Sequence, residues 1–248
     1  MSAFRRPVYF NPAASAISVE IAGKTNQDAK LIRRFHRQLP GYSQTGLVSL
    51  NDAARELGFG AVYLKDETSR LGLPSFKILG ASWGSFRALA ERLNLPLDTD
   101  LETLKNAAAA AAAAAGRNLV LYAATDGNHG RAVARMGTIF GIASQIHVPS
   151  TMHTTTVELI QSEGATVVAS TGSYDDAVLE AQKASNQDPI GVLIQDFAFG
   201  DYNVIPQVSP ITDLPSMPSS GLLCVSGVIM LIVLSLSSRS GLWMVTEQ

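Results

Sequence analysis

The sequence predicts an α/β fold in which helices flank parallel sheets. From Leu119 onward, strand-like and helix-like segments alternate through three rounds, an order typical of parallel strands joined by crossover helices. The predicted strands are residues 119–124, 144–148, 166–169 and 191–195, and the predicted helices between them are residues 126–140, 154–163 and 174–186. With 248 residues and 46% hydrophobic content, the chain can bury one large core or two smaller ones.

The first part of the chain predicts mainly helices. A charged helical pattern within residues 20–40 stops at Leu39-Pro40-Gly41, because proline and glycine end helices. Further predicted elements are a short helix over residues 51–58, a strand over residues 61–65 and a helix over residues 76–93. The nine consecutive alanines at residues 107–115 favour helix but carry no functional groups, which indicates an inserted helical extension.

Three regions are expected from these patterns. Residues 1–95 would form the N-terminal part of a large domain, and residues 96–205 a small α/β domain. Residues 206–248 differ in composition, because four prolines and four serines lie within residues 206–220 and are followed by an apolar run at residues 221–236. That run lies between the lengths of a buried helix and of a membrane span, so a membrane span is only the alternative interpretation.

Charge and cysteine content narrow the function classes. The net charge is −2 and no run of lysines and arginines occurs, which argues against a nucleic-acid surface. The single cysteine, Cys224, excludes an intramolecular disulfide and favours a reducing compartment. Arg5 and Arg6 are not followed by an apolar run of the kind found in secretory signals, so the expected location is the cytoplasm.

Two motifs together indicate a pyridoxal-phosphate site. Lys77 follows Phe76 and precedes Ile78 and Leu79, and these apolar neighbours would disfavour the ammonium form of a lysine that must attack a carbonyl. The second motif is the turn at residues 125–128, which follows a predicted strand.

The turn offers groups for both a substrate and a cofactor. Thr125, Asp126 and Gly127 precede a helix whose first N–H groups suit an anion such as a substrate carboxylate. Asn128 could hydrogen-bond the hydroxyl oxygen of a pyridine ring. Without Lys77, the same turn would be interpreted as an ordinary helix cap, because Asp and Asn are both favoured there.

Other candidate residues carry weaker signals. His129 could be catalytic, but a hydrogen bond that orients the turn is the favoured role. His147 and His153 have no third ligand at metal spacing, so no metal is expected. No Gly-x-Gly-x-x-Gly motif follows a strand, which disfavours a dinucleotide site.

The motifs resemble those of the diaminopropionate ammonia-lyases, which belong to the tryptophan-synthase-β-like, fold-type II pyridoxal-phosphate enzymes. The resemblance extends over roughly residues 35–207. Its matching stretches are residues 39–42, 65–70, 75–77, 124–131, 172–177 and 195–196. Serine and threonine dehydratases share the lysine and the Gly-Asn-His turn but generally lack an aspartate at the position of Asp126, which makes this residue the most discriminating one.

The resemblance implies a cofactor, a reaction and roles for individual residues. Lys77 would form the internal aldimine with pyridoxal 5'-phosphate, beside Phe76, and Asn128 would contact the ring. Asp126 and Asp196 would handle protons during elimination of ammonia from 2,3-diaminopropionate, which gives pyruvate and ammonia. The chemistry agrees, because elimination needs a base for the α-proton and an acid for the departing amine. Two carboxylates would let the site accept both stereoisomers of this small amino-acid substrate, and the chain could form a homodimer.

The end of the chain departs from the family pattern. The resemblance implies a glycine-rich loop that binds the cofactor phosphate and further strands of the large domain, and neither is found after Gln207. The hypothesis that the tail comes from a retained intron, a frame change or an incomplete gene model predicts that residues 221–236 lie outside the packed core. The alternative predicts that they replace missing strands beside residues 61–65. The alternatives for function are a serine or threonine dehydratase, a catalytically dead remnant and a membrane-tethered interaction protein.

Overall fold

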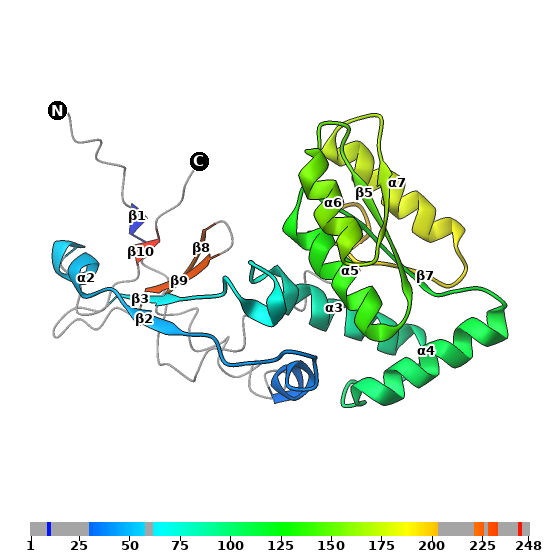
Figure 1. Ribbon diagram of the computed structural model, residues 1–248, viewed down its shortest axis with the longest axis horizontal. Coiled ribbons are helices and arrows are strands. Elements are labelled where there is room, and N and C mark those ends of the chain that lie inside the picture. The colour runs from blue at the N-terminus through cyan, green and yellow to red at the C-terminus, as the bar shows by residue number, and fades with distance from the viewer. Residues whose placement is uncertain are drawn as a thin grey trace. The chain divides into compact units, whose positions relative to one another are not determined.

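The computed structural model describes residues 30–57 and 62–202, together with the backbone of four short strands at residues 9–10, 221–225, 228–232 and 243–244. The chain divides into two compact units (Figure 1). One comprises residues 1–30, 44–76 and 213–248, and the other comprises residues 31–43 and 77–212. Each unit is described by itself.

The second unit contains a four-stranded parallel sheet with the order β6-β5-β4-β7. Its strands are β4 (Val120–Ala124), β5 (Ala143–Val148), β6 (Thr166–Ala169) and β7 (Gly191–Leu193). The α/β prediction is confirmed here, and all four strands were expected. The predicted last strand ran to Gln195, but β7 ends two residues earlier, where the backbone N–H of Gln195 donates to the Tyr202 hydroxyl instead of to a neighbouring strand.

Three crossover helices cover the two faces of this sheet (Figure 1). They are α5 (Asn128–Phe140), α6 (Thr154–Ser162) and α7 (Tyr174–Gln187). α5 and α6 pack against each other on one face, and α7 packs on β4 and β7 from the opposite face. α7 begins with a capping box, because the Ser173 side chain accepts from the Asp176 N–H while the Asp176 side chain accepts from the Ser173 N–H.

The second unit also contains a short helical segment at residues 31–36 and two longer helices. α3 (Lys77–Arg92) packs against α5, and α4 (Leu101–Ala115) contacts both. Trp83 and Phe86 of α3 stack with a ring-centroid distance of 5.3 Å, and Phe35 packs on Phe86 at 4.5 Å. The predicted alanine helix forms the second half of α4, which buries only Leu101, Leu104 and Ala108.

The first unit contains a four-stranded antiparallel sheet with the order β2-β3-β9-β8. Its elements are β2 (Leu47–Ser49), α2 (Asn51–Leu57), β3 (Tyr63–Lys65), the 3-10 helix η1 (Arg70–Gly72), β8 (Gly221–Val225) and β9 (Val228–Ile232). A separate two-stranded sheet joins β1 (Tyr9–Phe10) and β10 (Trp243–Met244). All pairings of this four-stranded sheet are antiparallel, and for β8 and β9 the short connection permits no other pairing.

The tail differs from the favoured expectation. The backbone of β9 pairs with β3, in the register Tyr63 to Leu231 and Lys65 to Ile229. This pairing is the arrangement that the alternative predicted, in which the apolar run adds strands beside residues 61–65. The physical reason is that β3 has an edge that β2 leaves open.

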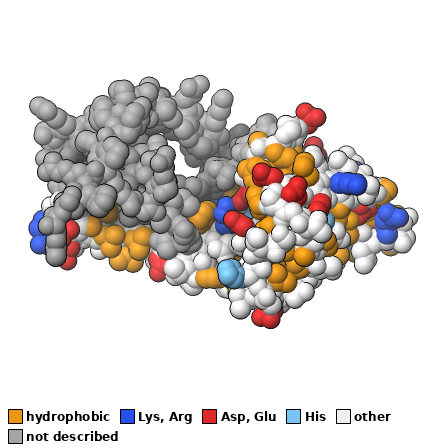
Figure 2. All heavy atoms as spheres, turned by 90° about the horizontal axis from the view of Figure 1, so that it is seen from above, with side chains coloured by type: hydrophobic (Ala, Val, Ile, Leu, Met, Phe, Trp, Pro, Cys, Tyr) orange, Lys and Arg blue, Asp and Glu red, His pale blue; other side chains and the backbone are white. Residues whose placement is uncertain are grey.

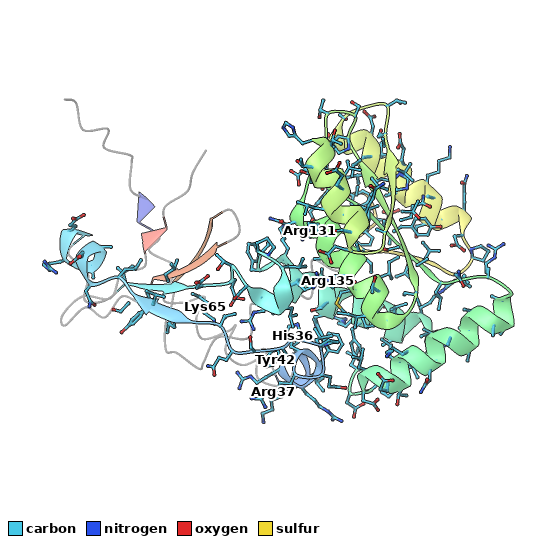
Figure 3. All side chains as sticks on the ribbon, in the orientation of Figure 1. His36, Arg37, Tyr42, Lys65, Arg131 and Arg135 are labelled. Atoms are coloured by element: carbon cyan, nitrogen blue, oxygen red, sulfur yellow. The ribbon has the colours of Figure 1, made fainter. Side chains whose placement is uncertain are left out.

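Buried charges hold the polar loop that follows β3. Lys65, whose position is labelled in Figure 3, donates to the Thr45 carbonyl at 2.8 Å, and its Nζ lies 3.4 Å from Glu67 Oε1. Arg70 donates to both carboxylate oxygens of Glu67 and, at 2.7 Å, to the Thr45 hydroxyl. Burial works to raise the pKa of Glu67, but the Arg70 and Thr45 hydrogen bonds outweigh it and the pKa is lowered. The predicted polar loop is therefore an ion-paired structural core.

The domain boundaries stay a prediction for the complete protein. Along the chain, the first unit gives way to the second between Phe76 and Lys77, whereas the sequence analysis placed a domain boundary after residue 95. Figure 2 shows acidic, basic and apolar side chains intermixed on the described surface. Within the described residues, none of the helices combines the length and apolar character needed to cross a bilayer.

Candidate active site

The site lies at the point where the order of the parallel strands reverses. From β4 the chain moves to β5 and β6 on one side, and then returns through α7 to β7 on the other side of β4. Such a reversal leaves a crevice outside the carboxyl ends of the two central strands, where α/β proteins bind ligands. Residues 125–128 follow β4 and residues 194–196 follow β7, so this topology brings the predicted site residues of both segments to one place.

Lys77 and Asp196 form an ion pair in the structure. Lys77 Nζ donates to Asp196 Oδ2 at 2.6 Å, although the residues are 119 positions apart in the chain. The Lys77 side chain is 39% exposed and the Asp196 side chain 26% exposed. The sequence predicted that apolar neighbours would shield the lysine. Instead, Lys77 is the first residue of α3, and Ile78 turns into the core while the amine meets a carboxylate.

The turn after β4 is organised by Thr125. Its side chain is buried, and its hydroxyl accepts from the N–H groups of Gly127 and Gly130, each at 2.9 Å. The Thr125 N–H donates to the His147 carbonyl at 3.0 Å, so Thr125 supports the turn and its contact with a substrate stays a prediction. Asp126 and Asn128 are exposed, and Gly127 is half-buried.

The start of α5 has free hydrogen-bonding capacity. The N-cap residue is Gly127, which has no side chain to cap the helix, and the Thr125 hydroxyl satisfies only the third N–H, that of Gly130. The turn is therefore not the ordinary Asp or Asn cap that was the alternative interpretation. The N–H groups of the first two residues, Asn128 and His129, precede the one that Thr125 binds, and N–H groups at a helix start attract anions, so they suit a substrate carboxylate.

The buried side chain of His129 connects the turn after β4 to the segment that follows β7. Its Nε2 donates to the Ile194 carbonyl at 2.9 Å, and its Nδ1 lies 3.8 Å from Asp196 Oδ2. Burial lowers the pKa of His129, against the opposing charge of Asp196. The carbonyl can only accept, so the neutral ring carries its proton on Nε2.

Asp196 is held as a carboxylate. Burial works to raise its pKa, but the hydrogen bond and charge of the Lys77 ammonium favour the carboxylate, and the pKa falls below the ordinary aspartate value of 3.8. Because burial keeps His129 neutral, the Lys77 ammonium is the partner that favours ionised Asp196 at neutral pH.

Two residues without a predicted role join the site. Gln195 is fully buried, its Oε1 accepts from the Ala124 N–H at 3.1 Å, and its Nε2 donates to the Tyr174 hydroxyl at 3.0 Å. Both residues fall in stretches on which the resemblance rests. Their position in these stretches could have marked them as site residues. Their hydrogen bond could not be predicted in the same way, because it joins segments that are distant in the chain.

Comparison with known proteins decides the family. Residues 38–208 match the family described as pyridoxal-phosphate dependent enzyme. The chain belongs to this family.

Relatives of this chain include proteins named diaminopropionate ammonia-lyase. The chain is 34% identical over 183 residues to diaminopropionate ammonia-lyase of Escherichia coli K12, covering 73% of this chain and 44% of the relative. It is 35% identical over 174 residues to the Salmonella typhimurium enzyme, covering 69% of this chain and 42% of that relative. The chain therefore spans less than half the length of the curated relatives it matches.

Solved structures agree with the fold. The apo form of Escherichia coli diaminopropionate ammonia lyase matches with a TM-score of 0.65 and 33% identity, over 74% of this chain and 48% of that one. A threonine deaminase from Solanum lycopersicum, 21% identical with a TM-score of 0.50 over 70% of this chain and 40% of that one, shows the fold alone. The predicted resemblance and fold class are confirmed.

The described residues fit the aldehyde end of the family's cofactor, pyridoxal phosphate. The amine of Lys77 is partly exposed and is held by a carboxylate at hydrogen-bond distance, so it can be directed at an aldehyde. Asn128 is exposed at the start of α5, where its amide could meet a ring oxygen, and Phe76 is half-buried immediately before Lys77. Among the described residues, no cluster of three or more histidine, cysteine or acidic side chains could hold a metal ion.

Proposed function

We propose that this chain carries the catalytic residues of a lyase that eliminates ammonia from 2,3-diaminopropionate and forms pyruvate and ammonia. One observation carries the proposal: Lys77 and Asp196 form an ion pair at the strand reversal, where Asp126 follows the adjacent strand. Relatives named diaminopropionate ammonia-lyase, at 34% and 35% identity, support the choice of substrate.

The proposed roles follow from the position of each group. Asp196 holds and orients Lys77 Nζ, the group that attacks an aldehyde once it has lost its proton. Bound pyridoxal phosphate supplies an electron sink for the negative charge that develops at the substrate's α-carbon. The first N–H groups of α5 bind the substrate carboxylate beside the turn at residues 125–127.

Proton transfer needs more than one group. One group must take the α-proton, and another must give a proton to the departing β-amine. We assign these steps to Lys77 and to the carboxylates of Asp126 and Asp196, which follow neighbouring strands. Carboxylates on two strands give the site a base for either stereoisomer of the substrate.

Cofactor binding is the direct test. The purified 248-residue chain, mixed with pyridoxal phosphate and freed of excess, is expected to show the visible absorbance of a lysine-bound cofactor. Lys77→Ala should abolish this absorbance. Lys105→Ala, which removes a lysine paired with Glu102 on α4, should keep it. A wild-type spectrum without the band, or a Lys77→Ala spectrum that retains it, would reject the proposal.

Asp126 separates this reaction from that of a dehydratase. Asp126→Ser should depress turnover of diaminopropionate while the absorbance of the bound cofactor stays. Unchanged turnover would remove the reason for choosing an ammonia-lyase. A cytoplasmic location is part of the proposal, supported by the single cysteine, and a homodimer stays a prediction.

A further inference from the structure

The backbone hydrogen bonds between β4 and β7 stop just before the site. The Ile194 N–H still donates to the Tyr122 carbonyl at 2.7 Å, as expected for parallel strands in this register. A regular parallel ladder would continue with the Ala124 N–H donating to the Ile194 carbonyl. In the structure, both of these backbone groups bind side chains instead.

Two buried side chains replace this backbone hydrogen bond. Gln195 Oε1 accepts from the Ala124 N–H at 3.1 Å, and His129 Nε2 donates to the Ile194 carbonyl at 2.9 Å. Gln195 is fully buried and the His129 side chain is 6% exposed, so bulk water does not reach these groups. The ends of β4 and β7 are therefore separated by side chains that satisfy the hydrogen bonds which the strands no longer make with each other.

The separation occurs on one side of β4 only. On its other side, the Thr125 N–H donates to the His147 carbonyl of β5 at 3.0 Å, one residue beyond Ala124. The end of β4 is therefore still part of the sheet and is not frayed. The strands part where their order reverses, which is where a ligand crevice is expected.

The separation changes the course of the chain toward Asp196. If the register of Tyr122 with Leu193 continued, Asp196 would lie beside Thr125 as a further residue of β7. Instead, the residue before Asp196 is fixed in another direction. The Gln195 backbone N–H donates to the Tyr202 hydroxyl at 2.9 Å, and its side-chain NH₂ donates to the Tyr174 hydroxyl at 3.0 Å.

We propose that His129 and Gln195 are positioning residues that keep the ends of β4 and β7 apart and thereby hold Asp196 opposite Lys77. Asp196 Oδ2 accepts from Lys77 Nζ at 2.6 Å, and His129 Nδ1 lies 3.8 Å from the same oxygen. This inference rests on the proposed function, in which Asp196 orients the reacting amine of Lys77. A displacement of about 1 Å in such an arrangement can lower a rate about 100-fold.

Removing both side-chain groups should allow the missing backbone hydrogen bond to form. His129→Met leaves the Ile194 carbonyl without its donor, and Gln195→Met leaves the Ala124 N–H without its acceptor, so each should lower the midpoint of urea denaturation. In the double variant, the two freed backbone groups can bind each other. Its loss of stability should therefore be smaller than the sum of the single losses, and losses that simply add would overturn the inference.

The position of Asp196 can be measured in the chain without cofactor. Near neutral pH, Asp196→Asn should lower the urea midpoint of the wild-type chain, because it removes the partner of Lys77. In the His129→Met, Gln195→Met background, Asp196→Asn should change the midpoint little, because the pair is already broken. An effect as large as in the wild-type chain would overturn the inference. If the double variant does not fold, Gln195→Met alone provides the background, with the same expectation.

Turnover separates positioning from stability. Gln195→Met and the double variant should each lower kcat about 100-fold with KM nearly unchanged, although the double variant regains stability. His129→Gln keeps an N–H near the position of Nε2 and should recover most of the kcat that His129→Met loses. A Gln195→Met enzyme with wild-type kcat would overturn the inference.

A matched control replaces another glutamine of the same sheet. Gln145 of β5 lies with its Nε2 3.0 Å from His147 Nε2 and so contacts a side chain, not the backbone of a neighbouring strand. Gln145→Met should leave kcat unchanged, and a loss as large as that of Gln195→Met would overturn the inference. A wild-type chain without turnover would instead reject the proposed function, and the urea measurements would still decide the role of His129 and Gln195.

Discussion

Replacing Gly130 with alanine should destabilise the second unit, because the structure leaves no room for a Cβ atom at this position. A Cβ at Gly130 would lie 2.3 Å from Thr125 Cγ2 and 2.8 Å from Ile146 Cγ2, both too close for real atoms. Overpacking of this kind costs about 1–3 kcal/mol. If Thr125 moves, the N–H groups that its hydroxyl binds lose their acceptor, at about 1–3 kcal/mol for a buried group. The helix preference of alanine returns about 1 kcal/mol, which leaves a net loss of about 1–5 kcal/mol.

The assay is urea denaturation followed by circular dichroism, with two comparisons. Gly137→Ala should cost less, because its Cβ would meet Ser144 Cβ at 3.1 Å. Thr125→Ser removes the clashing methyl and keeps the hydroxyl, so the double variant Thr125→Ser, Gly130→Ala should be more stable than the sum of the single losses predicts. Simple addition of the losses, or a stabilised Gly130→Ala, would refute this reasoning.

Three further predictions concern charged groups. Asp196→Asn should lose stability near neutral pH, but the difference from wild type should shrink as pH falls below the ordinary aspartate pKa of 3.8, because the lowered folded-state pKa stabilises only the ionised form. Unfolding free energies measured from pH 7 to pH 3 would contradict this if the difference stayed constant. Burial lowers the pKa values of His129 and His147, so the melting temperature should fall as the pH drops below the ordinary histidine pKa of 6.5. Melting curves that do not change with pH would contradict this prediction. Glu163→Gln leaves two arginines of α5 without a buried carboxylate and should lower the unfolding free energy, measured by urea denaturation, by about 3 kcal/mol. Glu102 is exposed, so Glu102→Gln should lower it by less than about 1 kcal/mol. Equal losses would show that burial is irrelevant.

That prediction for Glu163 depends on a pairing between α5 and the end of α6. Arg131 NH2 lies 2.9 Å from Glu163 Oε1, and Arg135 Nε lies 2.5 Å from Glu163 Oε2. Figure 3 shows both arginines on α5. The carboxylate is 6% exposed, so removing its charge would leave two cations close together in a poorly solvated place.

The parallel sheet was predictable because its signals are local. Strands such as β4 and β5 are buried along most of their length and therefore appear in the sequence as apolar runs. Helix starts were marked by residues such as Ser173, whose capping box needs only neighbouring positions. β2 was missed, because it has three residues, all exposed, and shows no alternation.

The site was predictable only as a set of residues. The sequence named Lys77, Asp126, Asn128 and Asp196 from motifs, but the ion pair of Lys77 with Asp196 joins positions 119 residues apart. The link from Gln195 to Tyr174 likewise depends on how α7 lies on β7. No local pattern encodes such contacts, because the crossover connections create them. The partly exposed, ion-paired state of Lys77 was missed for the same reason.

The alanine run in α4 has a consequence for how this gene can change. Leu101, Leu104 and Ala108 anchor the helix, and most of the alanines beyond Ala108 are exposed. The helix ends at Gly116, whose φ of 64° reverses the chain in open space. Gain or loss of alanines would lengthen or shorten the exposed end of the helix by about 1.5 Å per residue and leave the anchored half in register. Natural selection should therefore act only weakly on the length of the alanine run, and related genes should carry runs of different lengths at this position.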